Sequence, residues 1–319
     1  MTGVAIVGGG RMGQAHAQAW AALAPEVEVV AVVDRSAPRP LAGVPTARPT
    51  TDLEAVLRDP AIEVLSICTP TDTHLELTRR ALAADKHVLL EKPLARTVAD
   101  GEELVRLGAA ASGTLMIAHV VRFFPGYVAV RELAGSFGAL QEARAARLSP
   151  TGGRPPWLED EERSGGILLD LAVHDFDQLL LLLGPARRVE ATRLDDGTLQ
   201  ARVEHESGAV GWVHAGWDAP VSTPFRTSVE VIGTMGQARY AFASGVEAKS
   251  ELAVSAEGAE RLVEVDPGEP YVAQARAFLE CVRTGMPPTD GDPAASLAAV
   301  RLALAARESL LGWSAVEVG

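Results

Sequence analysis

An acidic and an imidazole side chain lie four positions apart in the most apolar part of the sequence. Asp170 and His174 fall within residues 167–183, and on a helix this spacing places both side chains on one face. Burying an ionisable pair costs free energy, so the pair should have a function or a hydrogen-bonded core role. The functional interpretation is a general base, His174, oriented by Asp170.

A metal ion is a further possibility at this position. Asp170 and His174 could be joined by His205 and His214 as ligands. The last two histidines lie on expected strands without the paired spacing of known sites, so we expect no metal.

A lysine follows an expected strand in the run Glu91-Lys92-Pro93. Of 29 basic residues only Lys86, Lys92 and Lys249 are lysines, so arginine serves almost wherever a generic cation suffices. Lysine at position 92 therefore indicates an amine that loses a proton or acts as a compact charge, which arginine cannot do. The alternative is a solvated surface lysine. The proline permits a cis peptide bond before it.

A glycine-rich run from Gly8 to Gly13 follows the first expected strand and opens a helix. Gly8 would permit the tight turn, Gly10 the approach of backbone to a pyrophosphate, and Gly13 close helix–strand packing. Asp34 ends the next expected strand about 20 residues later, where a carboxylate binds ribose hydroxyls. The run therefore predicts a dinucleotide site.

The charge at Asp34 favours NAD over NADP, because a carboxylate repels the additional phosphate of NADP. Arg35 and Arg39 lie close in sequence and could partly accommodate that phosphate. We expect NAD as the cofactor, with NADP possible.

The first third of the chain alternates strands with helices, which is typical of a doubly wound parallel sheet. Strands are expected at 4–7, 28–34, 64–68, 87–90 and 114–118, and helices at 12–23, 53–58, 74–84 and 98–111. This α/β pattern predicts an N-terminal Rossmann domain over residues 1–120.

Beyond residue 120 the pattern changes to strands joined by tight turns. It predicts a C-terminal α+β domain over 121–319 with a largely antiparallel open sheet. Helices near 125–134, 168–183, 272–283 and 293–310 would cover one side of it, leaving the other for a homodimer or homotetramer. Residues 149–166 read as a long irregular loop, in which Trp157 could stack on a sugar.

Composition restricts the partners. The 319-residue chain has a formal net charge of −13, which disfavours nucleic acid and anionic lipid, and its longest apolar stretch contains several charges. Cys68 and Cys281 show no disulfide or zinc spacing, and no signal peptide precedes the first strand. We therefore expect a cytoplasmic protein that acts on a small ligand, without nucleic acid or membrane partners.

With these residues placed, the chain resembles the glucose–fructose oxidoreductase, inositol dehydrogenase and rhizopine-catabolism family over essentially its full length. Three stretches carry the resemblance: the glycine run 8–13, the segment 69–93 that ends in Glu91-Lys92-Pro93, and residues 165–177. The last of these is most like the inositol 2-dehydrogenase branch. Val121 and the 149–162 loop depart from that pattern.

The resemblance implies roles for individual residues. Lys92, Asp170 and His174 match catalytic positions, and Arg122 matches an arginine near the substrate. Positions that contact the cofactor are matched by Gly8, Gly10, Arg11, Met12, Asp34, Thr69, Pro70 and Glu91. Gly13, Arg35, His74 and Lys92 complete the cofactor site that we expect, with His119 near the nicotinamide. The other early histidines, His16 and His87, are expected to pack or cap.

These roles predict an NAD-dependent oxidation of a sugar or cyclitol hydroxyl, with His174 taking the proton and Lys92 stabilising the alkoxide. One alternative is an enzyme that retains NAD and uses transient oxidation for glycoside cleavage or epimerisation. The other is a non-catalytic sensor of NAD or sugar.

Overall fold

The computed structural model describes residues 1–36, 39–150, 154–220, 222–245, 249–256 and 258–319. Its contacts divide the chain into two units. The first contains Met1–Phe123 and Glu269–Leu297, and the second contains Phe124–Gly268 and Ala298–Gly319. This division differs from the contiguous domains expected at 1–120 and 121–319, because one late segment belongs with the beginning of the chain.

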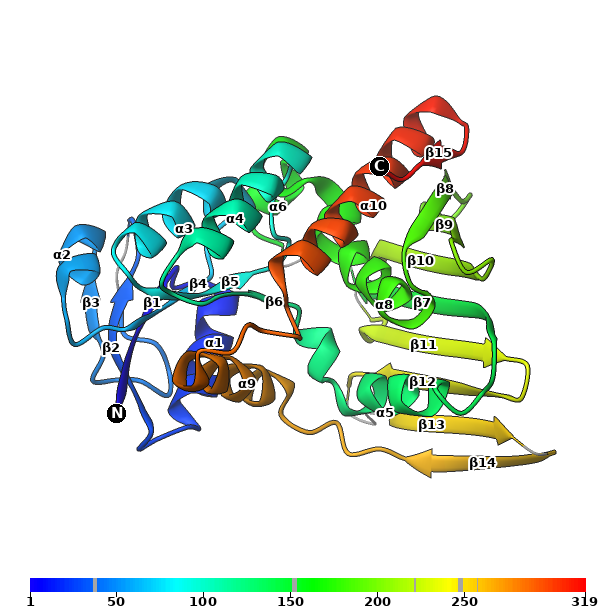
Figure 1. Ribbon diagram of the computed structural model, residues 1–319, viewed down its shortest axis with the longest axis horizontal. Helices are drawn as coiled ribbons and strands as arrows, with labels where there is room; N and C mark the ends of the chain where they lie inside the picture. The colour runs from blue at the N-terminus through cyan, green and yellow to red at the C-terminus, as the bar shows by residue number, and fades with distance from the viewer. Residues whose placement is uncertain (37–38, 151–153, 221, 246–248, 257) are drawn as a thin grey trace. The chain divides into compact units, whose positions relative to one another are not determined.

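The first unit is built on a six-stranded parallel sheet (Figure 1). In the order β3-β2-β1-β4-β5-β6, its strands are Arg48–Thr50, Val27–Val33, Thr2–Val7, Val64–Ile67, His87–Glu91 and Leu115–Ala118. Its helices include α1 (Arg11–Ala21), α2 (Leu53–Arg58), α3 (His74–Ala83) and α4 (Val98–Ala110). The strand order is that of a Rossmann fold, as expected.

The expected elements form where the apolar pattern places them, whereas the short edge strand β3 was not expected. Side-chain caps begin two of the helices: Asp52 accepts from Ala55 N at 2.9 Å, and Thr97 accepts from Asp100 N at 3.1 Å. The strands β1, β4 and β5 are buried on both faces, as parallel strands covered by helices should be.

Helix α9 (Pro270–Thr284) packs against α1 in this unit. Ala275, Phe278 and Leu279 join the core around Trp20, whose ring meets that of Phe278 at 6.3 Å in an edge-on arrangement. We expected the 272–283 helix to cover the second sheet, and this was wrong. Helical periodicity reveals that a helix has an apolar face, but not which sheet or helix will cover it.

The second unit is built on a nine-stranded sheet, also visible in Figure 1. In the order β14-β13-β12-β11-β7-β10-β9-β8-β15, its strands are Ala259–Glu264, Lys249–Ala256, Gly236–Ala243, Arg226–Gly233, Leu140–Pro150, Val210–Ala219, Leu199–His205, Ala186–Arg193 and Val316–Glu317. The pair β7–β10 is parallel and the other pairs are antiparallel, so the sheet is largely antiparallel as expected.

Helices α5 (Pro125–Ala134) and α8 (Val173–Leu183) pack on the central strands β7, β10, β11 and β12. Burial alternates along β9, where Leu199, Ala201 and Val203 are buried and the residues between them are partly exposed. One face of the sheet therefore carries the core of this unit. Helix α10 (Pro293–Gly312) contributes Ser309, whose Oγ accepts from Ala191 N at 2.9 Å.

Two short helices, α6 (Pro156–Glu159) and α7 (Glu161–Ser164), occupy much of the segment expected to be an irregular loop. Asp160 begins α7 by accepting from Glu162 N at 3.0 Å, and Gly165 ends it in the left-handed conformation. Part of the expected loop, residues 151–153, lies outside the described residues. Trp157 lies in α6 and is half-buried.

Candidate active site

The glycines of the first βα turn meet different physical demands. Gly8 has a φ of +104°, which favours glycine, and a Cβ on Gly13 would lie 1.9 Å from Gly8 O. Gly10 differs, because its φ of −76° suits any residue and a Cβ there would have no heavy atom within 4 Å. Backbone conformation and packing therefore explain why glycine is needed at positions 8 and 13. At position 10 the open space instead suits a ligand that approaches the backbone.

The first turn of α1 is suited to an anion. Its N-cap, Gly10, supplies no side-chain hydrogen bond, and no acidic side chain lies in the first turn, where Arg11 is exposed and Met12 is half-buried. The first N–H groups and the helix dipole thus present positive potential beside the open space at Gly10. These residues fit a pyrophosphate.

Asp34 follows β2 and is tied to the glycine turn. Its Oδ2 accepts from Gly9 N at 3.0 Å, and its Oδ1 accepts from Ser36 N at 3.2 Å. The two backbone donors orient the half-buried carboxylate beside the turn, where it can still accept from ribose hydroxyls, since each oxygen has two lone pairs. Arg35, the next residue, is exposed.

The loop after β4 is braced by hydroxyls and by a buried histidine. Thr73 Oγ1 donates to Pro70 O at 2.7 Å and lies 2.7 Å from Thr69 Oγ1. The ring of His74, 1% exposed, has Nε2 at 3.1 Å from Thr69 O and Nδ1 at 3.0 Å from Pro93 O. His74 therefore joins the loops after β4 and β5, and burial lowers its pKa although the carbonyls oppose that effect.

Lys92 lies at the carboxyl end of β5 and is half-buried. Its backbone N–H donates to Glu91 Oε2 at 3.1 Å, and the Lys92–Pro93 peptide bond is cis. The other Glu91 oxygen, Oε1, lies 2.9 Å from His16 Nε2. Both oxygens of the Glu91 carboxylate therefore have protein partners, on α1 and at Lys92.

His16 is the residue that the sequence reading missed. We expected it to pack or cap, but its ring lies buried at 2% exposure between Glu91 and Ser66, whose Oγ is 2.6 Å from Nδ1. Burial opposes protonation of the ring, yet Cys68 and Glu91 outweigh it and raise the pKa of His16 to about 10. The available signal was its position one turn after the glycine run, on the helix face toward the sheet.

Two further expected residues follow β6. His119 is 1% exposed, and its backbone N–H donates to Ile117 O at 2.8 Å. Arg122 is 2% exposed and its Nη1 donates to Thr289 O at 3.4 Å, so this guanidinium ties the strand end to the segment before α10.

The first unit thus gathers its candidate residues at one edge of the parallel sheet. Gly8, Asp34, Thr69, Lys92 and His119 each follow the carboxyl end of a strand: β1, β2, β4, β5 and β6, respectively. Ligands of open α/β sheets bind at this edge. The arrangement can hold a dinucleotide along the glycine turn and present an amine near its far end.

In the second unit, Asp170 and His174 lie where the helix changes pitch. Residues Leu168–Ala172 form a π-helical turn that leads directly into α8, so Asp170 lies within this turn and His174 just after it. Single π-turns occur frequently at functional sites. His174 is buried at 8% exposure, whereas Asp170 is half-buried.

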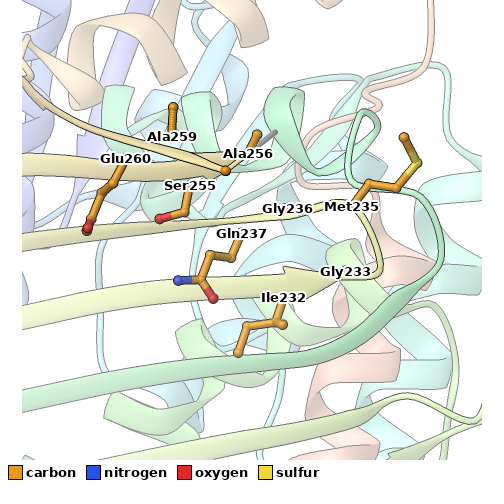
Figure 2. A pocket seen from close by; sticks show the side chains of 10 residues that line it. Ile232, Gly233, Met235, Gly236, Gln237, Ser255, Ala256, Ala259 and Glu260 are labelled. Carbon is orange, nitrogen blue, oxygen red and sulfur yellow. The ribbon is translucent and has the colours of Figure 1, made fainter.

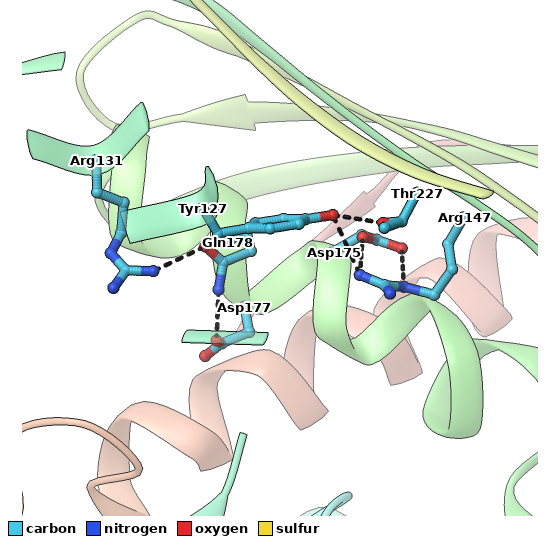
Figure 3. A network of polar contacts seen from close by, with 7 residues as sticks. All are labelled: Tyr127, Arg131, Arg147, Asp175, Asp177, Gln178 and Thr227. Carbon is cyan, nitrogen blue, oxygen red and sulfur yellow. Dashed lines mark hydrogen bonds and ion pairs between the residues drawn. The ribbon is translucent and has the colours of Figure 1, made fainter. Parts of the chain in front are cut away.

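The residue after His174 anchors α8 to the sheet, as Figure 3 shows. Asp175 is fully buried and accepts from Arg147 Nη2 at 2.9 Å and from Arg147 Nε at 3.2 Å. Arg147 Nη2 also donates to Tyr127 Oη at 3.4 Å, and Tyr127 Oη is hydrogen-bonded to Thr227 Oγ1. This network fixes the start of α8 and therefore the backbone that carries His174.

An open hollow of about 420 Å³ lies elsewhere in this unit, at the ends of strands β11 to β14 (Figure 2). Its lining includes Met235, Gln237, Ser255 and Glu260, but none of the expected site residues. Among the described residues of the lining, Glu260 is the only titratable group, so they offer no pair for acid–base catalysis.

Metal chemistry finds no support among the described residues. They contain no group of three histidine, cysteine or acidic side chains arranged to hold an ion. His205 Nδ1 lies 2.8 Å from Gly184 O, and His214 Nε2 lies 2.8 Å from Thr198 Oγ1, so both histidines have hydrogen-bond partners within the second unit.

Among the described residues, no helix has the length and apolar character needed to cross a membrane.

Two family models match the chain. Residues 2–119 match the oxidoreductase family with an NAD-binding Rossmann fold, and residues 127–239 match the GFO/IDH/MocA C-terminal domain. These matches agree with the fold of each unit and with the motifs at the strand ends.

Individual relatives point in the same direction. A 1,5-anhydro-D-fructose reductase of Ensifer adhaerens is 32% identical over 229 residues, which are 66% of this chain and 67% of that protein. An inositol 2-dehydrogenase of Rhizobium meliloti strain 1021 is 32% identical over 181 residues, 56% of this chain and 54% of that one. The crystal structure of GenD2 from gentamicin A biosynthesis, in complex with NAD, has a TM-score of 0.83 and 27% identity, covering 100% of this chain and 96% of that one.

Proposed function

Because this chain belongs to the GFO/IDH/MocA oxidoreductase family, we propose that it transfers hydride between NAD and a hydroxyl of a sugar or cyclitol. The observation that carries this proposal is the position of Lys92, which follows β5 at the same sheet edge as the glycine turn and Asp34. Relatives that act on inositol and on an anhydro-sugar support the substrate class.

The first unit would hold the cofactor. The α1 N-terminus and the space at Gly10 would take the pyrophosphate, and Asp34 would accept from the adenosine ribose. When bound, NAD supplies the hydride acceptor. The exposed Arg35 beside Asp34 leaves NADP possible as a second cofactor.

Proton transfer would be the task of this chain's own side chains. His174 would take the proton of the substrate hydroxyl, with Asp170 orienting its ring. Lys92 would donate a hydrogen bond to the same oxygen and stabilise its developing negative charge. Arg122 and Trp157 would contact other hydroxyls of the substrate. Retention of NAD for another reaction and a sensor without catalysis are not favoured, because the matched relatives include named dehydrogenases and a reductase.

The test is absorbance at 340 nm while the purified chain meets inositols, aldoses and anhydro-sugars, with NAD and NADP tested separately. We expect steady NADH production with one substrate class in the wild type. Lys92→Met should lose about 10²-fold or more in kcat because the alkoxide loses its stabilising donor. The exposed Lys249 provides a matched control, since Lys249→Met removes an equal charge and should leave kcat unchanged. Absence of turnover across the panel would contradict the proposal.

We also propose a homo-oligomer assembled through the second unit's sheet. On the face opposite the core, neighbouring strands align Arg202, Trp212, Arg144 and Glu230 in a row. Such a row offers apolar area together with both signs of charge, so it suits a second copy of the same surface. Light scattering of the wild type and of Trp212→Glu should show a dimer or tetramer that the variant weakens; a monomeric wild type at micromolar concentration would overturn the assembly.

The two free cysteines, Cys68 and Cys281, suit a reducing compartment such as the cytoplasm. We propose that location for the reaction, and fractionation of the native cells would test it.

A further inference from the structure

Glu91 connects helix α1 to the backbone of Lys92. The carboxylate is 4% exposed, with Oε1 at 2.9 Å from His16 Nε2 and Oε2 accepting from Lys92 N at 3.1 Å. An ionised carboxylate only accepts hydrogen bonds, so Nε2 must be the donor. The imidazole therefore holds one oxygen while the backbone at the proposed catalytic lysine uses the other.

The opposite side of the His16 ring is held as firmly. Ser66 Oγ lies 2.6 Å from Nδ1, and Trp20 Nε1 donates to the same hydroxyl at 3.3 Å. Ser66 can accept from a protonated Nδ1 or donate to a neutral one, so the ring keeps Nε2–H directed at Glu91 in either charge state. Cys68 and Glu91 raise the pKa of His16 to about 10 against the effect of burial, which favours the charged ring.

We infer that His16 is a positioning residue for Lys92: it orients Glu91, which in turn fixes the backbone from which the Lys92 side chain extends. The inference rests on the proposed function for the role of Lys92. All the groups involved lie in the first unit, on α1, β4 and the end of β5. A buried series of charge-assisted hydrogen bonds restricts side-chain orientation more than packing alone does, because each donor or acceptor can form its hydrogen bond in only a few directions.

The decisive comparison uses three variants. His16→Leu fills the space but removes the donor to Glu91, whereas His16→Gln keeps an N–H donor at a similar reach. Leu23→Ala is the matched control, since Leu23 is 1% exposed in the core cluster that also contains Trp20, and its truncation weakens packing without touching Glu91. Thermal melts establish that each variant folds and how far its midpoint falls.

Activity is the first measurement. A displaced reacting group costs about 10²-fold in rate, so His16→Leu should lower kcat by about that factor while changing KM for NAD much less. His16→Gln should recover most of the lost rate, and Leu23→Ala should retain near-normal kcat despite its lower melting midpoint. An equal loss of kcat in Leu23→Ala and His16→Leu would show a purely structural role and overturn the inference.

The second measurement does not depend on turnover. The chain has only three lysines besides its α-amine, so reductive methylation with ¹³C-formaldehyde gives few NMR signals. Lys86→Arg and Lys249→Arg identify two of them, and the α-amine is recognised by its titration at about pH 8, which leaves Lys92. His16→Leu should move the Lys92 signal and its titration midpoint, while His16→Gln and Leu23→Ala should leave them near the wild-type positions. An unmoved Lys92 signal in His16→Leu would contradict the inference. If that signal moves as expected but no substrate is oxidised by the wild type, the proposed function fails and the positioning link stands.

Discussion

The backbone N–H of Gly9 donates to Oδ2 of Asp34 over 3.0 Å, which joins the turn after β1 to the end of β2. The carboxylate is thus oriented before any cofactor binds, and little entropy remains to be lost when ribose hydroxyls are engaged.

Replacing that carboxylate should change cofactor preference. Asp34→Ser removes the charge that repels the phosphate of NADP and weakens the ribose contacts, so kcat/KM for NAD should fall by about 10- to 100-fold, as expected for a lost hydrogen bond to a charged group. By contrast, kcat/KM for NADP should fall less or should rise, because Arg35 can accommodate the additional phosphate of NADP. Initial rates with both cofactors check this. A parallel fall for NAD and NADP would indicate damage to the turn instead.

The two glycines at either side of the first turn of α1 should respond differently to the same change. Gly10→Ala adds a methyl group where no atom lies within 4 Å, so stability should change by about 1 kcal/mol at most while NAD affinity falls at least tenfold. Gly13→Ala places its methyl 1.9 Å from Gly8 O and should cost about 1–3 kcal/mol or more of stability. Urea unfolding and NAD titration of both variants separate these effects; equal NAD affinity in Gly10→Ala and the wild type would contradict the assignment of that space to the cofactor.

His174→Ala should lose about 10²- to 10⁴-fold in kcat, because a general base contributes that much. Added imidazole should restore part of the rate in a concentration-dependent way. His214→Gln is the control, since His214 is half-buried in β10 and bonded to Thr198, and its rate should stay near that of the wild type. A near-normal rate in His174→Ala would remove His174 from the mechanism.

The buried pair Arg147–Asp175 should be sensitive to loss of either partner. Asp175→Asn leaves the Arg147 guanidinium buried without its counter-charge, which costs about 3–5 kcal/mol of unfolding free energy. Arg147→Met together with Asp175→Leu removes both charges and should recover much of that loss. Chemical denaturation of the wild type, Asp175→Asn and the double variant compares their unfolding free energies. If Asp175→Asn lowered the unfolding free energy by no more than about 1 kcal/mol, the value typical of an exposed ion pair, the network would not anchor α8.

Stability should fall as the solution becomes mildly acidic. Burial lowers the pKa of His205 in the folded chain, with its carbonyl partner at Gly184 opposing the shift, so the unfolded chain binds this proton more readily. The contribution is fully present above the ordinary pKa of 6.5 and is lost as pH falls from there toward the folded value. One such group adds a slope of at most about 1.4 kcal/mol per pH unit.

His205→Asn tests that dependence, because its amide can donate to the Gly184 carbonyl as Nδ1 does but does not titrate. Urea unfolding between pH 7.5 and 5 should show a shallower decline for the variant than for the wild type. Identical pH slopes would exclude His205 as a source of the acid sensitivity.

The sequence allowed the first unit to be predicted nearly element by element, because its strands are short apolar runs that alternate with amphipathic helices. The glycine run and Lys92 were also recognisable, since their residue types are unusual for their positions. The partners of His16 were not, because the contacts with Ser66 and Glu91 connect positions 50 and 75 residues away along the chain. Local patterns carry no information about pairs at such separation.

The π-helical turn at Leu168–Ala172 escaped prediction for a related reason. Its residues have the composition of an ordinary buried helix, so nothing in their sequence distinguishes a π-helical turn from an α-helical one. The expectation that Asp170 and His174 lie on one face assumed a regular α-helix. The π-helical turn has more residues per turn, so the angle between the two side chains around the helix axis differs from the one assumed.

The path of the chain limits how the molecule can be taken apart. It passes between the two units after Phe123, after Gly268 and again after Leu297. A fragment ending near residue 120 would leave Trp20 without Phe278 and expose an apolar surface. Anyone exchanging specificity modules among relatives would therefore have to transplant two separate gene segments together, because recombination only after Phe123 would combine the sheet of the first unit from one relative with helix α9 from another.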